Sequence, residues 1–132
     1  MPRPFPSILY GLLPVAAVNA ALGTELQAGL VRLTARAHAH MADKHPADYP
    51  ACIAALATVI ATPSFIGQAP GHTGNFEFVR RVARPDGRAV LVAVGLERDA
   101  AGFYLVRTSY LITAETVDNR RRAGRLIAPP RP

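Results

Sequence analysis

Hydrophobic residues in the first half of the chain recur mainly with helical spacing. The run Val15–Leu22 predicts a short helix that ends at Gly23, because glycine adopts the left-handed cap conformation without strain. Leu30–Leu33 predicts a brief strand. Thr34 then predicts the N-cap of a helix over residues 35–44.

A third helix is predicted after Asp48, which we expect to cap it. Its apolar positions have the spacing of a helix with one buried face: Ile53, Leu56, Ala57 and Ile60. Pro63 ends this helix, and residues 64–74 predict a glycine-rich loop.

The second half of the chain changes to short runs typical of strands. Strands are predicted over residues 75–84, 88–96 and 103–112, with a tight turn at residues 85–87. Thr113 predicts the cap of a last, short helix. The order predicts an α+β fold, in which N-terminal helices pack on an antiparallel β-meander of three to four strands and a short C-terminal helix follows.

A chain of 132 residues has the size of one domain. We expect a Pro-rich and apolar N-terminal arm over residues 1–14, a single domain over 15–127 and a loose tail over 128–132. The apolar run 7–22 is similar to a secretory signal, but a proline and an asparagine interrupt it, so a helix that docks on the domain is the better interpretation. The run is also too short to span a bilayer, and no membrane partner is expected.

The charge of the chain is concentrated in its second half. The formal net charge is +6, of which residues 1–66 carry +1 and residues 67–132 carry +5. An arginine-rich surface gains affinity for a polyanion through counterion release, although a solvated basic surface is the alternative. The single cysteine, Cys52, lies in an apolar helical run and predicts a buried thiol.

Candidate chemistry gathers around the only lysine of the chain. Arg36, His40 and Lys44 lie four residues apart and share one face of their predicted helix. Pro46 disfavours helical geometry at His45 and places that imidazole at the exit turn. Imidazoles transfer protons and an ammonium neutralises developing negative charge, which are the requirements for cleaving a phosphodiester without a metal.

Other interpretations of the histidines remain open. A zinc site is disfavoured because the two histidines are five residues apart, no glutamate follows the first, and Lys44 would repel a dication. We therefore expect no metal and no cofactor. A structural pair of surface histidines is the other alternative. His72, in the glycine-rich loop, is an isolated candidate for contact with a substrate.

The last predicted strand has two faces: Leu105, Arg107 and Ser109 on one, and Tyr104, Val106, Thr108, Tyr110 and Ile112 on the other. We expect the second, bulkier face to point to the core, with Thr108 and Tyr110 as its polar groups. If RNA is the ligand, arginines of the first strand and last helix are expected phosphate contacts: Arg80, Arg81, Arg84, Arg120, Arg121, Arg122 and Arg125.

A succession of short segments spans residues 20–127: Leu22-Gly23, Val31-Arg-Leu-Thr34, His40–Pro46, Thr62-Pro-Ser-Phe-Ile-Gly67, Thr108-Ser-Tyr110 and Arg122-Ala-Gly-Arg-Leu126. This succession resembles a group of phage and mobile-element nuclease domains in the superfamily that unites the barnase, EndoU, colicin and RelE nucleases. The most specific element is the segment from His40 to Pro46, which contains Lys44 and His45.

The resemblance implies a metal-independent ribonuclease. The 2′-OH of the substrate would attack its own phosphate, giving a 2′,3′-cyclic phosphate and a free 5′-OH. His40 and His45 would then be the acid/base pair, Lys44 would stabilise the phosphorane, and Thr108 or Ser109 would hold a phosphate oxygen. Substrate contacts are predicted at Arg36, Arg80, Arg107, Tyr110 and Arg122.

We therefore predict a toxin-like endoribonuclease that acts on RNA, with tRNA as a candidate substrate, in the cytoplasm. The chain would act by itself or as part of a larger effector, and an immunity or antitoxin protein is a candidate partner. A non-catalytic RNA-binding or interaction module of the same fold is the main alternative, and a metal-dependent hydrolase is the third.

Overall fold

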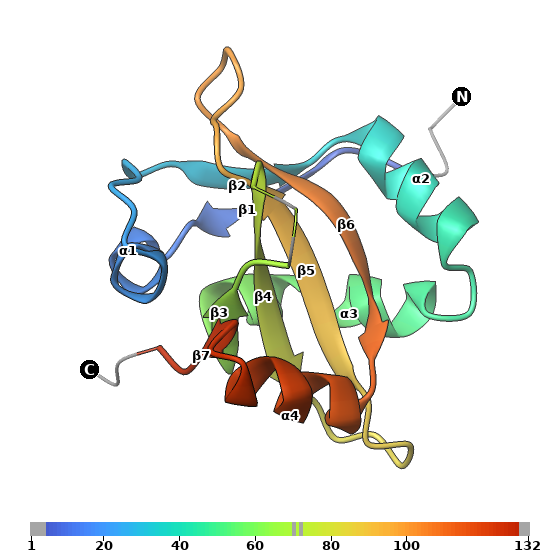
Figure 1. The fold of residues 1–132 in the computed structure, drawn as a ribbon. Coiled ribbons are helices and arrows are strands. Elements are labelled where there is room, and N and C mark those ends of the chain that lie inside the picture. The colour runs from blue at the N-terminus through green and yellow to red at the C-terminus, as the bar shows by residue number, and fades with distance from the viewer. Residues whose placement is uncertain (1–4, 70, 72, 130–132) are drawn as a thin grey trace.

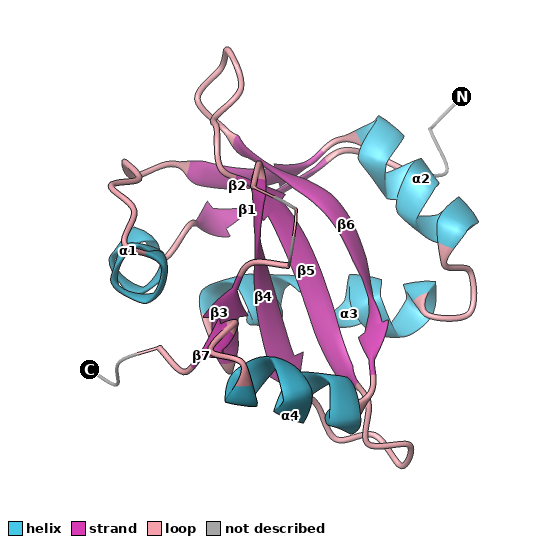
Figure 2. Ribbon diagram, in the orientation of Figure 1, coloured by secondary structure: helices cyan, strands magenta, loops and turns pink. Residues whose placement is uncertain are grey.

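The computed structural model describes residues 5–69, 71 and 73–129 (Figures 1 and 2). The helices are α1 (Val15–Leu22), α2 (Ala35–Lys44), α3 (Tyr49–Ala61) and α4 (Ala114–Arg122). The strands are β1 (Ile8–Leu12), β2 (Leu30–Leu33), β3 (Phe65–Gly67), β4 (Asn75–Arg81), β5 (Ala89–Gly95), β6 (Tyr104–Ile112) and β7 (Leu126–Ile127). No helix within these ranges is long and apolar enough to cross a membrane.

The strands form one seven-stranded mixed sheet in the order β1-β2-β6-β5-β4-β3-β7. Only β2 and β6 pair in parallel, and the other neighbours are antiparallel. The α+β class is thus confirmed, and β4, β5 and β6 form the predicted meander at the centre. The expected three to four strands are too few. Strands β3 and β7 are too short for a residue pattern to reveal them, and β1 lies in the apolar run that we interpreted as a docking helix.

The helices leave part of one sheet face uncovered. Helix α3 packs across one face, and the main hydrophobic core lies between them, with Leu56, Phe76 and Val92 fully buried (Figure 1). Helix α4 covers one end of the opposite face, over a smaller cluster that includes Leu91 and Val117. Helix α2 packs beside β6, whose pairing with β2 is limited to its first two residues. We call the side with α4 the open face.

Most of the predicted helix ends are confirmed. The Thr34 and Thr113 side chains accept backbone N–H groups at the starts of α2 and α4, and Gly23 ends α1 with a φ of 68°. Asp48 is the N-cap residue of α3, as predicted, but its side chain makes no capping hydrogen bond. Its carboxylate instead accepts the backbone N–H of Leu111 at 3.1 Å, so it joins the start of α3 to β6.

Part of the expected N-terminal arm, from residue 5 onward, has regular structure and side-chain contacts. Residues 8–12 form the edge strand β1, so only the second part of the predicted docking run is helical. The ring of His38 bridges the Pro6 carbonyl oxygen, at 2.9 Å, and the Tyr49 hydroxyl, at 2.6 Å. Phe5 packs edge-on against both rings. These contacts fasten the segment before β1 to α2 and α3.

The predicted glycine-rich loop contains strand β3. At Gly67 the chain passes so close to β7 that an added Cβ would lie 1.8 Å from the Arg125 carbonyl oxygen. Only glycine permits this approach, and the pairing of β3 with β7 depends on it. His72, the candidate of this loop, lies outside the described residues.

Candidate functional site

A β-bulge in β6 sets the geometry of the open face. Ala93 of β5 pairs with Thr108, whereas the next residue, Val94, pairs with Val106, so Arg107 is an extra residue in β6. The bulge reverses the alternation of faces along the strand. Our predicted division of this strand into two faces therefore holds only before the bulge.

The bulge exchanges the faces on which two neighbouring hydroxyl groups lie. Thr108 is half-buried and lines a hollow on the open face. Ser109 is 0% exposed, and its hydroxyl donates to the Leu91 carbonyl oxygen at 2.7 Å. The prediction that Ser109 binds a phosphate oxygen therefore needs correction, because its hydroxyl is already used inside the sheet.

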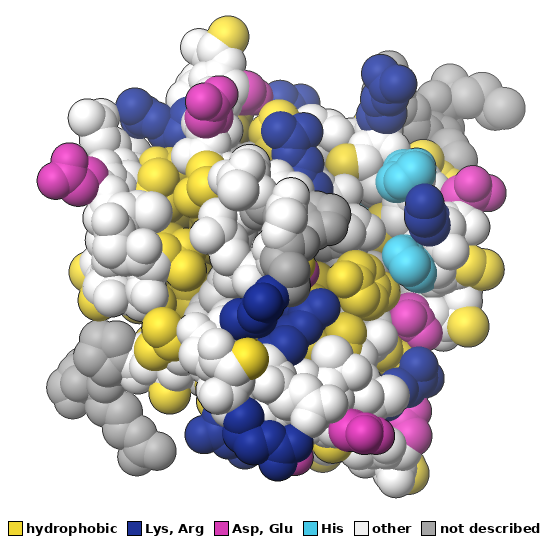
Figure 3. Space-filling model, viewed as in Figure 1, with side chains coloured by type: hydrophobic (Ala, Val, Ile, Leu, Met, Phe, Trp, Pro, Cys, Tyr) yellow, Lys and Arg dark blue, Asp and Glu magenta, His cyan; other side chains and the backbone are white. Residues whose placement is uncertain are grey.

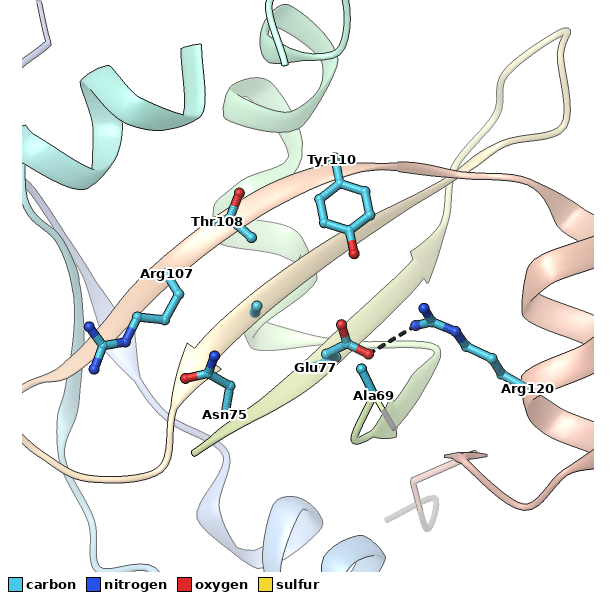
Figure 4. A pocket seen from close by; sticks show the side chains of 8 residues that line it. Ala69, Asn75, Glu77, Arg107, Thr108, Tyr110 and Arg120 are labelled. Atoms are coloured by element: carbon cyan, nitrogen blue, oxygen red, sulfur yellow. Dashed lines mark hydrogen bonds and ion pairs between the residues drawn. The ribbon is translucent and has the colours of Figure 1, made fainter. Parts of the chain in front are cut away.

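A cavity of about 330 Å³ opens on the open face beside β6 (Figure 4). It is lined by Ala69, Asn75, Glu77, Ala93, Arg107, Thr108, Tyr110 and Arg120. In the close view the Tyr110 hydroxyl points toward Glu77, and Arg120 reaches in from α4. We call this cavity the Tyr110 cavity. It combines hydroxyl, carboxylate and guanidinium groups contributed by β4, β6 and α4.

Glu77 is the functional group that sequence reasoning missed. It is 6% exposed, and its carboxylate accepts a hydrogen bond from Arg120 at 2.9 Å. One sequence feature could have pointed to Glu77: it is an acidic residue between Phe76 and Phe78, in a strand that is otherwise apolar there. Strand alternation directs the two phenylalanines into the main core, so the acid between them must face the other side.

Tyr110 remains a hydrogen-bond donor at neutral pH. Burial raises the pKa of its phenol above the usual value of 10.0, and the charge of Glu77 raises this pKa further. Arg120 acts in the opposite direction, through a hydrogen bond and its charge. A protonated phenol beside guanidinium groups is suited to donate to an anionic ligand.

His45 lies at the predicted exit turn, with its ring beside Tyr110. It is the C-cap residue of α2, and its backbone N–H donates to the Met41 carbonyl oxygen. Its half-buried ring lies 5.0 Å from the Tyr110 ring, centroid to centroid, with 31° between the planes. The remaining histidine of α2, His38, is only 3% exposed and bonds to Pro6 and Tyr49 as described above.

A second hollow, of about 400 Å³, lies between α2 and β6, and we call it the His40 groove. Its lining includes the exposed side chains of Arg36 and His40. Lys44 is also exposed, one turn beyond His40 on α2. In Figure 3 histidine side chains lie beside a Lys or Arg side chain at this edge, and further Lys and Arg side chains gather nearer the centre.

Arg107 lines both the Tyr110 cavity and the His40 groove. Its guanidinium extends across β5 at Gly95, where an added Cβ would lie 3.2 Å from Nε. The bulge and this glycine thus place one exposed cation at the junction of the two hollows. The two hollows meet at Arg107, and together we call them one surface. Of the other predicted site residues, Arg36 and His40 line the groove, and Thr108 and Tyr110 line the cavity. His45 and Lys44 line neither hollow, although the His45 ring lies beside Tyr110.

Two predicted substrate contacts lie away from this surface. The Arg80 guanidinium donates to the backbone carbonyl and hydroxyl oxygens of Thr62. Arg122 donates to the side chain of Asn119 within α4 and lines a different hollow with Arg121. Neither arginine lines the Tyr110 cavity or the His40 groove.

Within residues 5–69, 71 and 73–129, no group of three or more His, Cys, Asp or Glu side chains is arranged to hold a metal ion. The donor set of the surface is instead made of arginine, histidine and hydroxyl groups around one buried carboxylate. Comparisons of the chain with protein-family models, with curated proteins and with solved structures found no match.

Proposed function

We propose that this chain is a metal-independent endoribonuclease whose site is the surface shared by the Tyr110 cavity and the His40 groove. The observation that carries the proposal is the position of Arg107, which lines both hollows while His45 contacts Tyr110. Proton-transfer groups and phosphate-binding groups therefore lie on one surface. We also propose that the chain belongs to the nuclease superfamily that its sequence resembles.

The cationic groups would hold the scissile phosphate. Arg107 and Arg120 present guanidinium forks, which match phosphate oxygens in a bidentate manner. The hydroxyl groups of Thr108 and Tyr110 line the same cavity and can donate to the remaining oxygens. Charge that develops on the phosphorane would be stabilised by these donors, with Lys44 as a further cation at the α2 side.

Two proton transfers complete the reaction. A base removes the proton of the 2′-OH as this oxygen attacks the phosphorus, and an acid protonates the 5′-oxygen as its bond to phosphorus breaks. We assign these roles to the pair His40 and His45, one lining the groove and the other against Tyr110. The products are a 2′,3′-cyclic phosphate and a 5′-OH, and no metal ion is required.

Cleavage of RNA in EDTA tests the proposal. Purified protein is incubated with total tRNA and with an unstructured RNA, and the 3′ ends of the products are examined for cyclic phosphate. Replacement of a group that acts by acid–base catalysis should slow cleavage by about 100-fold or more, so His40→Ala and His45→Ala should each lose activity to this extent. Arg107→Ala should lose activity through weaker phosphate binding.

The matched control is Arg98→Ala, which removes the same charge from the β5–β6 turn at the other end of the sheet from α4 (Figure 1). It should cleave at the wild-type rate. Equal rates for His40→Ala, His45→Ala and wild type would overturn the catalytic assignment. Tight, salt-dependent RNA binding without cyclic ends would instead favour a non-catalytic RNA-binding module.

We further propose that the enzyme is toxin-like, acts on RNA such as tRNA in the cytoplasm, and is held inactive by an immunity or antitoxin protein. Expression of the chain without a protective neighbour should then arrest growth of the host. His45→Ala should relieve that arrest at the same expression level, because relief would depend on loss of catalysis and not on loss of protein.

A further inference from the structure

Two guanidinium groups contact one phenylalanine ring on the far side of α4. Arg81 Cζ, from the end of β4, lies 5.1 Å from the centroid of the Phe65 ring, and Arg121 Cζ, from α4, lies 4.7 Å from it. Phe65 is nearly completely buried in β3. The ring therefore holds the two cations in place by cation–π interaction.

Neither of these cations forms an ion pair with an acidic side chain among the described residues. The ion pairs found there join Arg84, Arg88 and Arg120 to acids, and Arg81 and Arg121 are in none of them. Two like charges on one ring repel each other, and a bound anion would relieve that repulsion. A stacked guanidinium also keeps the N–H groups at its edge available for an oxygen ligand.

The same two arginines line a cleft of about 630 Å³, which we call the Phe65 cleft. Its other walls come from the start of α1, from the connection between α3 and β3, and from Ala128 and Pro129 after β7. Those walls are mainly apolar, with Pro14, Ala17 and Pro63 among the lining residues. A cleft with one cationic wall and one apolar wall matches a nucleotide unit, which has an anionic phosphate and a flat base whose faces pack on apolar surface.

Helix α4 lies between this cleft and the site proposed above. Arg120 reaches Glu77 in the Tyr110 cavity, whereas the next residue, Arg121, reaches Phe65 in the cleft. Consecutive helical residues point about 100° apart, so the arginine run serves both sides of the helix. A nucleic-acid strand that leaves the Tyr110 cavity could therefore cross α4 and meet a second pair of cations.

We propose that the Phe65 cleft is a second nucleotide site for single-stranded RNA. A phosphate binds between Arg81 and Arg121, and the attached base packs on the apolar wall. The identity of the strand as RNA substrate rests on the proposed function, but the chemistry of the cleft is measurable without cleavage. An acidic polypeptide is the competing occupant, and the apolar wall favours a base over a chain of carboxylates.

Binding of single-stranded DNA tests the proposal, because DNA lacks the 2′-OH and cannot be cleaved by this reaction. Fluorescence anisotropy with labelled DNA compares wild type with the double variant Arg81→Ala/Arg121→Ala. Affinity should fall by roughly tenfold. Two lost phosphate contacts should also lower the slope of log affinity against log salt by about 1.4, since each contact on a single strand contributes roughly 0.7.

The control variant Arg98→Ala should bind DNA within twofold, roughly, of wild type, because it removes one charge from a residue that does not line the cleft. If the alanine pair does not fold, Arg81→Lys/Arg121→Lys replaces it. Lysine keeps the charge but not the planar fork, so the salt slope should be retained while affinity falls severalfold. If the double variant that folds, alanine or lysine, binds DNA with the affinity of wild type, the proposal is overturned.

A poly-glutamate peptide serves as the second probe. Binding of this peptide without binding of DNA would also overturn the proposal, in favour of a protein partner. The two proposals fail separately. Wild type that binds DNA through the cleft but leaves no cyclic phosphate on RNA refutes only the proposed function, and wild type that cleaves RNA while the double variant binds normally refutes only the cleft.

Discussion

Glu77 and Arg120 form an ion pair of 2.9 Å that joins β4 to α4 across the open face of the sheet. The pair has two consequences. It fixes α4 against the sheet, and it places one negative charge inside a cavity whose other charged groups are guanidiniums. A phosphate entering this cavity would meet Arg120 already held in position by the carboxylate.

The first prediction concerns the stability of this ion pair. Arg120→Ala should lower the free energy of unfolding by about 3 kcal/mol, because removing one partner of a buried pair leaves the desolvation cost of the other. Adding Glu77→Gln to that variant should restore part of the loss. Urea denaturation of both single variants and the double variant measures the coupling, and additive effects would show that the pair is not energetically linked.

The second prediction separates two histidines of α2. His38→Ala should lower the free energy of unfolding by roughly 2 to 3 kcal/mol, because it removes the bridge between Pro6 and Tyr49 from a buried site. His40→Ala, at an exposed position, should change it by less than about 0.5 kcal/mol. Thermal or urea unfolding measures both, and similar losses would contradict the structural role of His38.

The third prediction is a loss of stability at alkaline pH. Burial raises the pKa of Tyr10 from 10.0 to about 12, and the charge of Tyr49 adds to this effect. Between these values the unfolded chain releases a proton that the folded protein retains, so the contribution is complete below pH 10 and is lost as pH rises toward 12.

Tyr10→Phe should therefore lose less stability than wild type over this pH range. Urea denaturation at stepped pH values measures the difference, and the absorbance of tyrosinate follows the titration directly. Parallel stability curves for wild type and variant would contradict the raised pKa of Tyr10.

The fourth prediction tests the close approach of β3 and β7. Gly67→Ala should be strongly destabilising, because its Cβ would collide with the Arg125 carbonyl oxygen. Gly11→Ala in β1 is the matched control, since an added Cβ there meets no atom within 4 Å. Its free energy of unfolding should stay within about 1 kcal/mol of wild type. Equal Tm values for the two variants would contradict the described approach.

Helix α2 shows what local sequence can predict. Its bounds, its cap at Thr34 and the exit turn at His45 agree with the prediction, because capping and the effect of Pro46 act within a few residues. Strand β6 shows the limit. Its bounds are close to those predicted, but the bulge at Arg107 exists only in the pairing with β5, and it reverses the faces that simple alternation assigns.

The sequence by itself determined the α+β class, the helices with their threonine caps, the central meander and the gathering of cations in the second half. These features follow from local propensity and composition. Only the tertiary structure decided the rest: the seven-stranded sheet, the burial of Ser109, the pairing of Glu77 with Arg120, and the position of Arg107 in two hollows. Each of these depends on contacts between segments far apart in the chain, whose energies no local pattern of residues records.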